Sequence, residues 1–98
     1  MIRLTVSDLD GTLMPYGEKC VSPSVISAIN RVTDNGITFA VSSGRTYTEL
    51  LTYLPELSDK AYFICCDGAL CVYKNKVIYV YYYILNFFLV LFLHNAKQ

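Results

Sequence analysis

Three short β-rich runs alternate with two amphipathic stretches along this chain, and this order constrains the fold more than any other feature of the sequence. The β-rich runs cover residues 2–6, 37–41 and 61–66. Strands that alternate with helical segments are typical of βαβ units, whose crossovers are right-handed and whose strands are parallel. The order therefore predicts an α/β fold with three parallel strands.

Two crossover helices are predicted between these strands. The first covers residues 23–34, because Ser22 and Pro23 form a good N-cap and first-turn pair and the apolar spacing is helical at Ile26, Ile29 and Val32. The second ends before Pro55, and its apolar face consists of Tyr47, Leu50, Leu51 and Leu54. Residues 70–73 and 76–79, joined through Lys74 and Asn75, are predicted to form a β-hairpin.

Glycine and polar side chains follow the end of each predicted parallel strand. They form the segments Asp8-Leu9-Asp10-Gly11-Thr12, Ser43-Gly44-Arg45 and Asp67-Gly68. In open parallel sheets, ligands bind outside the carboxyl ends of the strands. The coincidence of three such segments indicates one binding site at that rim.

The residue types at this rim suit phosphoryl transfer. One of the two carboxylates, Asp8 or Asp10, can attack phosphorus, and the other can protonate the leaving oxygen and later activate water. Mg²⁺ is expected, because two carboxylates facing a phosphate repel it unless a hard cation neutralises the site. Ser43 and Gly44 offer a hydroxyl and backbone N–H groups at the expected start of the second helix, where phosphate is favoured.

These motifs resemble the haloacid dehalogenase superfamily. Residues 8–13 (DLDGTL) resemble its first motif, and residues 41–45 (VSSGR) resemble its second motif in the form typical of the Cof-type sugar-phosphatase branch. Residues 66–69 (CDGA) lie where that branch usually has Asn-Gly-Ala, and the predicted hairpin resembles the segment that leads into its cap domain. The resemblance covers roughly the first 80 residues and rests on the order and spacing of three motifs.

The resemblance implies a Rossmann-like three-layer core, of which this chain would be the N-terminal part, and a Mg²⁺-dependent phosphomonoester hydrolase. Its substrate would be a small phosphorylated metabolite, with sugar phosphates as one class. Asp8 would be the nucleophile and a magnesium ligand. Asp10 would be the general acid/base, with its backbone carbonyl on the metal.

For the second and third motifs, the resemblance implies a role in binding. Ser43 would bind the transferring phosphate with help from the Gly44 N–H, and Asp67 with Gly68 would border the substrate. Arg45 would anchor its loop rather than contact phosphate.

The chain also departs from the family pattern. Family members continue with a cap domain, a lysine that neutralises the site and an acidic pair that completes the metal centre. The lysines Lys60, Lys74, Lys76 and Lys97 lie in other segments, and no acidic residue follows Asp67, which itself replaces the usual asparagine. The isolated chain is therefore expected to be incomplete as an enzyme, and a catalytically inactive remnant is the alternative interpretation. Without the rest of the sheet, residues 2–6 would form an open apolar edge, which predicts low solubility.

Charge and cysteine usage exclude several other classes. Lys plus Arg and Asp plus Glu each number 8, so the basic excess expected of a nucleic-acid-binding protein is absent. The four cysteines form no CxxC pair and the single histidine, His94, lies far from them, which argues against zinc. Buried free thiols and a cytoplasmic location fit better than a disulfide framework.

The apolar C-terminal segment is interpreted separately, with residues 1–80 as the partial hydrolase core and residues 81–98 as a tail. Residues 77–93 contain one strongly polar side chain, Asn86, and are just long enough to span a bilayer. Three interpretations remain open. The tail could be a membrane anchor, a helix or strand packed on the sheet, or unrelated sequence joined to the core.

Overall fold

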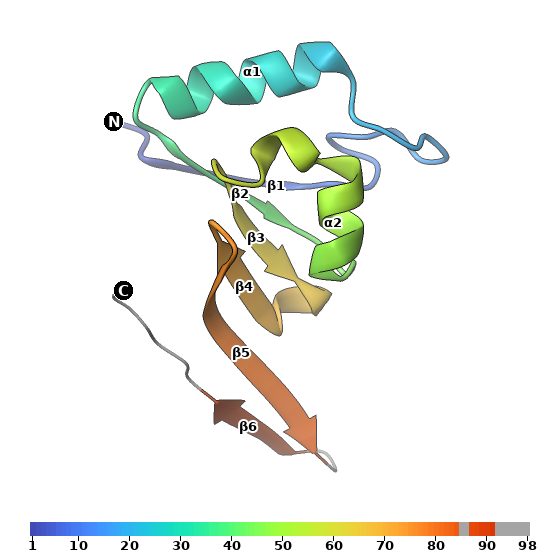
Figure 1. Cartoon of the computed structure of the whole chain (residues 1–98), viewed down its shortest axis with the longest axis vertical. Coiled ribbons are helices and arrows are strands. Elements are labelled where there is room, and N and C mark those ends of the chain that lie inside the picture. Colours follow the sequence, from blue (N-terminus) through green and yellow to red (C-terminus); the bar gives the residue numbers. More distant parts are fainter. Residues whose placement is uncertain (85–86, 92–98) are drawn as a thin grey trace.

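A computed structural model describes residues 1–84 and 87–91 of the chain (Figure 1). It contains one six-stranded sheet, two α-helices and two short 3₁₀ turns. The strands are β1 (Leu4–Asp8), β2 (Thr38–Ser42), β3 (Tyr62–Cys65), β4 (Leu70–Tyr73), β5 (Lys76–Ile84) and β6 (Phe87–Leu91). The helices are α1 (Pro23–Asp34) and α2 (Tyr47–Tyr53), and the 3₁₀ turns are η1 (Pro55–Leu57) and η2 (Cys66–Gly68).

The strands lie in the sheet in the same order as in the sequence. β1, β2 and β3 pair in parallel, and β3, β4, β5 and β6 pair antiparallel. The predicted α/β fold, with crossover helices and a hairpin, is confirmed. β1 begins and ends two residues later than predicted, so Asp8 is the last residue of the strand.

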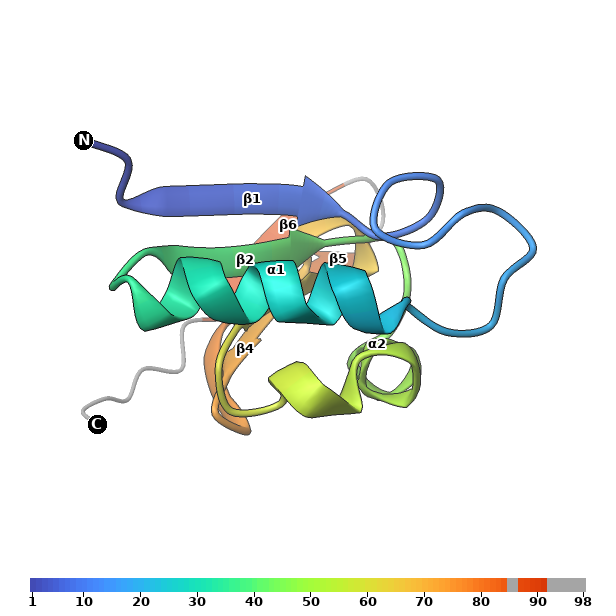
Figure 2. The ribbon, with the colours of Figure 1, turned by 90° about the horizontal axis from the view of Figure 1, so that it is seen from above.

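Both helices cover the same face of the sheet, as Figure 2 shows for α1, which lies along β2. Alternate residues of β2 and β3 point into this layer and are almost fully buried against side chains from both helices. This core includes Leu9, Met14, Ile26, Ile29, Phe39, Val41, Leu50, Leu54, Leu57, Phe63 and Cys65. The described residues thus form the sheet and one helical layer of the three-layer arrangement. The helical layer packs on one face of the parallel strands.

The ends of α1 lie where the sequence predicts them. The Ser22 hydroxyl accepts a hydrogen bond from the Val25 N–H at 3.4 Å, and Gly36 follows the helix with a φ of 78°. The start of α2 differs from the prediction, because the helix begins at Tyr47 rather than beside Ser43 and Gly44. Thr46 is its N-cap and forms a reciprocal capping box with Glu49, which satisfies two N–H groups that the helix leaves free.

The predicted hairpin is present and β5 extends beyond it. Lys74 and Asn75 have φ values of 52° and 62°, the left-handed pair that a two-residue hairpin turn requires. β5 continues through residue 80, the expected boundary of the core, and pairs with β6. Residues 85–86 and 92–98, which include Asn86, His94 and Lys97, lie outside the described residues. No helix within 1–84 or 87–91 has the length and apolarity to cross a membrane.

The cysteines match the expectation of buried free thiols in part: of the adjacent pair Cys65 and Cys66, only Cys65 is buried. Cys65 and Cys71 are buried in the sheet, whereas Cys20 and Cys66 are exposed, and all four are free. Burial, followed by the neighbouring Cys66 and Cys71, raises the pKa of Cys65 to about 12. The Cys65 thiol therefore stays protonated at neutral pH and serves as an apolar core group.

We predict that Thr46→Ala destabilises the fold by about 1 kcal/mol, because the substitution leaves the Glu49 N–H without its hydroxyl acceptor. Urea denaturation followed by circular dichroism measures the change. Thr48→Ala is the matched control, since Thr48 is an exposed residue of the same helix that makes no cap. Equal midpoints for the two variants would contradict the role of the cap.

The second prediction concerns β1, which within the described residues pairs only with β2 and carries Leu4 and Val6 at 57% and 53% exposure. An apolar edge strand is a template for association. We expect the double variant Leu4→Thr and Val6→Thr to increase the soluble fraction and reduce the apparent mass in size-exclusion chromatography with light scattering. An unchanged elution profile at matched concentration would count against this edge as the source of association.

Candidate active site

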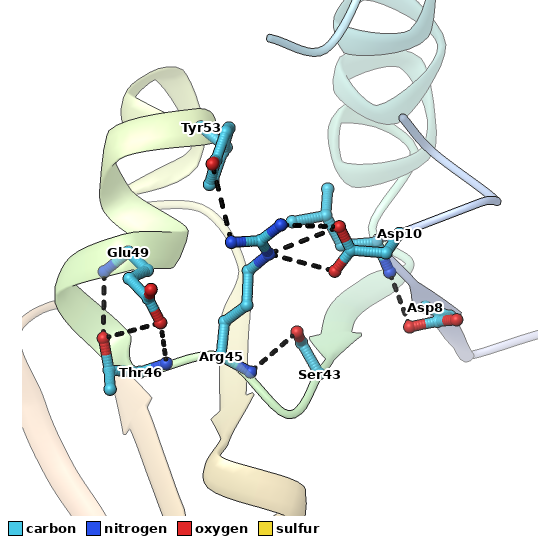
Figure 3. Close-up of polar contacts among 8 residues, drawn as sticks. Asp8, Asp10, Ser43, Arg45, Thr46, Glu49 and Tyr53 are labelled. Atoms are coloured by element: carbon cyan, nitrogen blue, oxygen red, sulfur yellow. Dashed lines mark hydrogen bonds and ion pairs between the residues drawn. The ribbon is translucent and has the colours of Figure 1, made fainter. Parts of the chain in front are cut away.

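The carboxyl ends of β1, β2 and β3 lie level with one another at one rim of the sheet. The parallel register pairs Asp8 with Ser42, and Ser42 with Ile64. The segments that follow these residues therefore emerge side by side. Figure 3 shows the first two of them, with the Asp10 carboxylate directed at Arg45 and Asp8 near it at the end of β1. The prediction that these segments share one rim is confirmed.

In the loop after β1, the residue between the two aspartates is buried in the core, and the two aspartates themselves remain accessible to solvent. Leu9 has no exposed surface, whereas Asp8 is exposed and Asp10 is about one-third exposed. The Leu9 carbonyl accepts the N–H groups of Thr12 and Met14, at 3.2 and 3.0 Å, which closes the loop tightly. Burial of Leu9 thus fixes the backbone from which both carboxylates project.

Gly11 is required in this loop for two reasons. Its φ is 79°, in the left-handed region that favours glycine. A Cβ atom at this position would also overlap the ring of Tyr16. The glycine next to the two aspartates is therefore explained by the local backbone and by the close approach of Tyr16.

Asp8 keeps an accessible carboxylate. Its Oδ1 accepts the N–H of Leu9 at 2.9 Å, and this bond orients the side chain (Figure 3). Among residues 1–80, no cation forms an ion pair with Asp8. The oriented, exposed oxygen is the kind of group that can attack an electrophile or bind a hard cation.

Arg45 holds Asp10 with a two-pronged ion pair. Its Nε donates to Asp10 Oδ2 at 3.0 Å, and its Nη2 donates to Oδ1 at 2.8 Å (Figure 3). The guanidinium also stacks over the ring of Tyr53 in α2, 4.6 Å from its centre. Arg45 thereby ties the loop after β1 to the second helix, in keeping with an anchoring role.

The same contact sets the charge state of Asp10. Hydrogen bonding from Arg45, assisted by its positive charge, lowers the pKa of Asp10 against the opposing effect of burial. The pair likewise raises the pKa of Arg45 above its already high ordinary value. Asp10 is therefore an ionised carboxylate whose charge is balanced by Arg45, whereas Asp8 has no ion-pair partner among residues 1–80.

Ser43 is a buried polar residue at the end of β2, with 6% of its surface exposed. Its Oγ accepts the N–H of Arg45 at 3.0 Å, and its backbone N–H donates to the carbonyl of Ile64 at 2.9 Å. The hydroxyl proton of Ser43 remains available as a donor. The helix dipole adds little here, because α2 begins at Tyr47 and its first turn is already capped by Thr46.

The turn after β3 is joined to the loop after β2 by backbone hydrogen bonds. The N–H of Cys66 donates to the Arg45 carbonyl at 2.9 Å, and the N–H of Asp67 donates to the Ser43 carbonyl at 3.1 Å. A Cβ built on Gly44 would lie 3.0 Å from Asp67 Oδ1, so the Asp67 carboxylate lies against Gly44. The structure therefore brings Ser43, Gly44 and Asp67 together, with Gly68 completing the turn.

The aspartates of the rim offer carboxylate oxygens as possible metal ligands. Within residues 1–84 and 87–91, no three His, Cys, Asp or Glu residues come close enough together to enclose a metal ion. Mg²⁺ nevertheless needs few protein ligands, because it retains several waters and accepts one or two carboxylates. The exposed Asp8 carboxylate fits such a site, whereas the Asp10 carboxylate is occupied by Arg45.

The sequence did not indicate every residue of this arrangement. Tyr53 was assigned no role at the rim, and no local pattern links a helix tyrosine to a loop arginine eight residues earlier. The capping box of Thr46 and Glu49 was also missed, although the Thr-x-x-Glu pattern was a usable signal for it. These residues position the site without belonging to its predicted motifs.

Comparison with known proteins agrees with this geometry. Residues 5–89 match a family model described as haloacid dehalogenase-like hydrolase. A curated relative, 5-amino-6-(5-phospho-D-ribitylamino)uracil phosphatase YbjI of Escherichia coli, is 26% identical over 78 residues, which are 80% of this chain and 29% of the relative.

Solved structures give the same result. A crystal structure of a protein from Eubacterium rectale is 29% identical, with a TM-score of 0.78, over 85% of this chain and 31% of that one. A haloalkanoate-superfamily phosphatase from Bacteroides thetaiotaomicron is 33% identical, with a TM-score of 0.64, over 80% of this chain and 29% of that one. The chain thus spans less than a third of the length of these relatives. Because the family model matches residues 5–89 and the solved relatives share the fold, the chain belongs to the family of haloacid dehalogenase-like hydrolases.

Proposed function

We propose that this chain carries the nucleophile of a Mg²⁺-dependent phosphomonoester hydrolase. The observation that carries this proposal is the exposed and oriented carboxylate of Asp8 at the carboxyl end of β1. Asp10 lies two residues further on the same rim, and Ser43 with Gly44 follows the neighbouring strand. Membership of the hydrolase family supports the reaction class.

The reaction proceeds in two displacements. An Asp8 oxygen forms a bond to phosphorus while the bond from phosphorus to the alcohol oxygen breaks, giving an aspartyl phosphate. The departing oxygen takes a proton from Asp10. Water then attacks phosphorus, gives a proton to Asp10 and releases inorganic phosphate and the Asp8 carboxylate.

Arg45 affects the two proposed roles of Asp10, proton acceptor and proton donor, in opposite ways. The ion pair stabilises the ionised carboxylate, which is the form that accepts a proton from water. The protonated form needed in the first displacement is disfavoured while the pair is closed. Separation of Arg45 from Asp10 is therefore part of the acid step in this mechanism.

The phosphate oxygens are received by the loop after β2. The hydroxyl of Ser43 and the N–H of Gly44 are the donors, and the turn of Asp67 and Gly68 borders the ester. The Asp8 carboxylate and the Asp10 backbone carbonyl would hold Mg²⁺. When bound, the metal reduces the repulsion between these carboxylates and the phosphate.

The substrate that we propose is a small phosphorylated metabolite of the sugar or polyol type. The name of the Escherichia coli relative identifies a phosphorylated ribityl chain as the substrate of that protein. The candidate site is an open rim rather than an extended basic surface, which suits a small ester. Direct turnover of a panel of sugar and polyol phosphates would identify the class.

A catalytically inactive form is the second candidate. The observation that favours it is the engagement of Arg45, the cation of the rim, by Asp10 and Tyr53. In the described part of the chain, Lys60 bonds to Asn30 and Lys74 lies over the ring of Tyr73, both away from the strand ends. In this form, phosphate at the loop of Ser43 would meet carboxylates while Arg45 is held by Asp10 and Tyr53.

Turnover of para-nitrophenyl phosphate separates these two candidates. The hydrolase candidate requires Mg²⁺-dependent hydrolysis that falls by about three orders of magnitude or more in Asp8→Asn, because the amide cannot form the aspartyl phosphate, whereas the inactive candidate requires no turnover by either chain. Asp59→Asn, which changes an exposed carboxylate at the opposite end of β3, should retain the rate. Equal rates for the wild-type chain and Asp8→Asn would reject Asp8 as the nucleophile.

The role of Arg45 is tested by the titration of Asp10. In Arg45→Met, we expect the pKa of Asp10 to rise toward its ordinary value of about 3.9, as followed by the carboxyl carbon shift in NMR. Since the wild-type pKa is lowered, the pair stabilises the fold above about pH 4 and loses this effect as the pH falls through the lowered pKa. The destabilisation of Arg45→Met should therefore be larger at pH 7 than at pH 2.

Arg31→Met is the matched control for this titration, because Arg31 is exposed and contacts Ser27 rather than a carboxylate. An Asp10 titration that is identical in Arg45→Met and wild type would contradict the ion pair.

A further inference from the structure

We propose that Asp67 determines which phosphate esters this rim accepts, by disfavouring those without a hydrogen-bond donor beside the phosphate and favouring those that carry a hydroxyl group there. This inference rests on the proposed function in one respect, namely that the loop of Ser43 and Gly44 receives the phosphate. It goes further by naming the side chain that selects the ester and the chemical group that it selects.

The position of Asp67 is built into the backbone. Its N–H donates to the carbonyl of Ser43 at 3.1 Å, and the preceding N–H, of Cys66, donates to Arg45. Its φ of 55° lies in the left-handed region, which directs the side chain back over the loop after β2. Its Oδ1 would lie 3.0 Å from a Cβ at Gly44, so any ligand that reaches the Gly44 N–H also comes close to this carboxylate.

The charge of Asp67 is not neutralised by its neighbours. Among residues 1–80, the ion pair at the rim is the one between Arg45 and Asp10, which uses Nε and Nη2 of the guanidinium, while Nη1 donates to the Tyr53 hydroxyl at 3.5 Å. Asp67 is exposed and has no ion-pair partner in that part of the chain. A phosphate beside Gly44 therefore faces a full negative charge at short range.

An ionised carboxylate can only accept hydrogen bonds. A phosphate ester with no adjacent donor is repelled by Asp67 and forms no hydrogen bond with it that would offset this repulsion. An ester with a hydroxyl group one or two carbons from its phosphate can donate to Asp67, and a hydrogen bond to an ionised acceptor is stronger than a neutral one. The carboxylate thus discriminates between esters of equal size by their hydroxyl groups.

The test compares glycerol 1-phosphate with propyl phosphate, which has the same carbon chain without the hydroxyl groups. Binding is followed through the amide of Gly44 in ¹⁵N–¹H spectra with Mg²⁺ present, so that turnover is not needed. We expect the wild-type chain to bind the glycerol ester about tenfold more tightly than the propyl ester.

Asp67→Asn removes the charge and keeps the shape, and asparagine tolerates the left-handed backbone as aspartate does. In this variant, we expect propyl phosphate to bind roughly threefold to tenfold more tightly than in wild type, and the preference for the glycerol ester to shrink. The gain should decrease at high salt, since the interaction is electrostatic. Asp59→Asn, which removes one charge at the other end of β3, should behave as wild type.

The same preference in Asp67→Asn as in wild type would overturn the proposal. A Gly44 amide that responds to neither ester in any of the three chains would also overturn it, because the loop would then not receive phosphate. A wild-type chain that shows the preference but hydrolyses neither ester would contradict only the proposed hydrolysis and would leave the selectivity in place.

Discussion

Parallel pairing of β1, β2 and β3 is the constraint on which the rest of this structure depends. The register places Asp8, Ser42 and Ile64 level with one another, so the three segments that follow them begin at the same rim. The helices make this pairing possible by crossing on one face and burying Phe39, Val41 and Phe63 beneath them. A shift of one residue in this register would turn buried side chains outward and separate the polar segments.

Hydrogen bonds and one ion pair convert this shared rim into a defined arrangement of side chains. Backbone bonds from Cys66 and Asp67 join the second and third segments, and the contact between Arg45 and Asp10 joins the first to the second. The result is an uneven distribution of charge. Asp10 is neutralised, whereas Asp8 and Asp67 keep exposed carboxylates, which is why these three aspartates are assigned different roles.

Much of the fold was predictable from local patterns. The limits of α1 follow from Ser22, Pro23 and Asn35 with helical apolar spacing, and the turn of the hairpin follows from Lys74 and Asn75. The start of α2 was misplaced, because Ser43 and Gly44 resemble a helix start and the true cap, Thr46, lies only three residues beyond Ser43. β5 was expected to end near residue 79, but its pairing with β6 extends it to Ile84. Cross-strand pairing of this kind has no signature within a single segment.

The sequence by itself determined the alternation of strands and helices, the three polar segments at the strand ends and the family that these motifs indicate. These features depend on residue type and short-range spacing, which a linear sequence contains in full. Only the tertiary structure decided that Arg45 neutralises Asp10, that Tyr53 supports Arg45 and that Asp67 lies against Gly44. Each of these contacts joins residues from different elements, so its geometry arises only when the strands are in register and the helix is packed on the sheet.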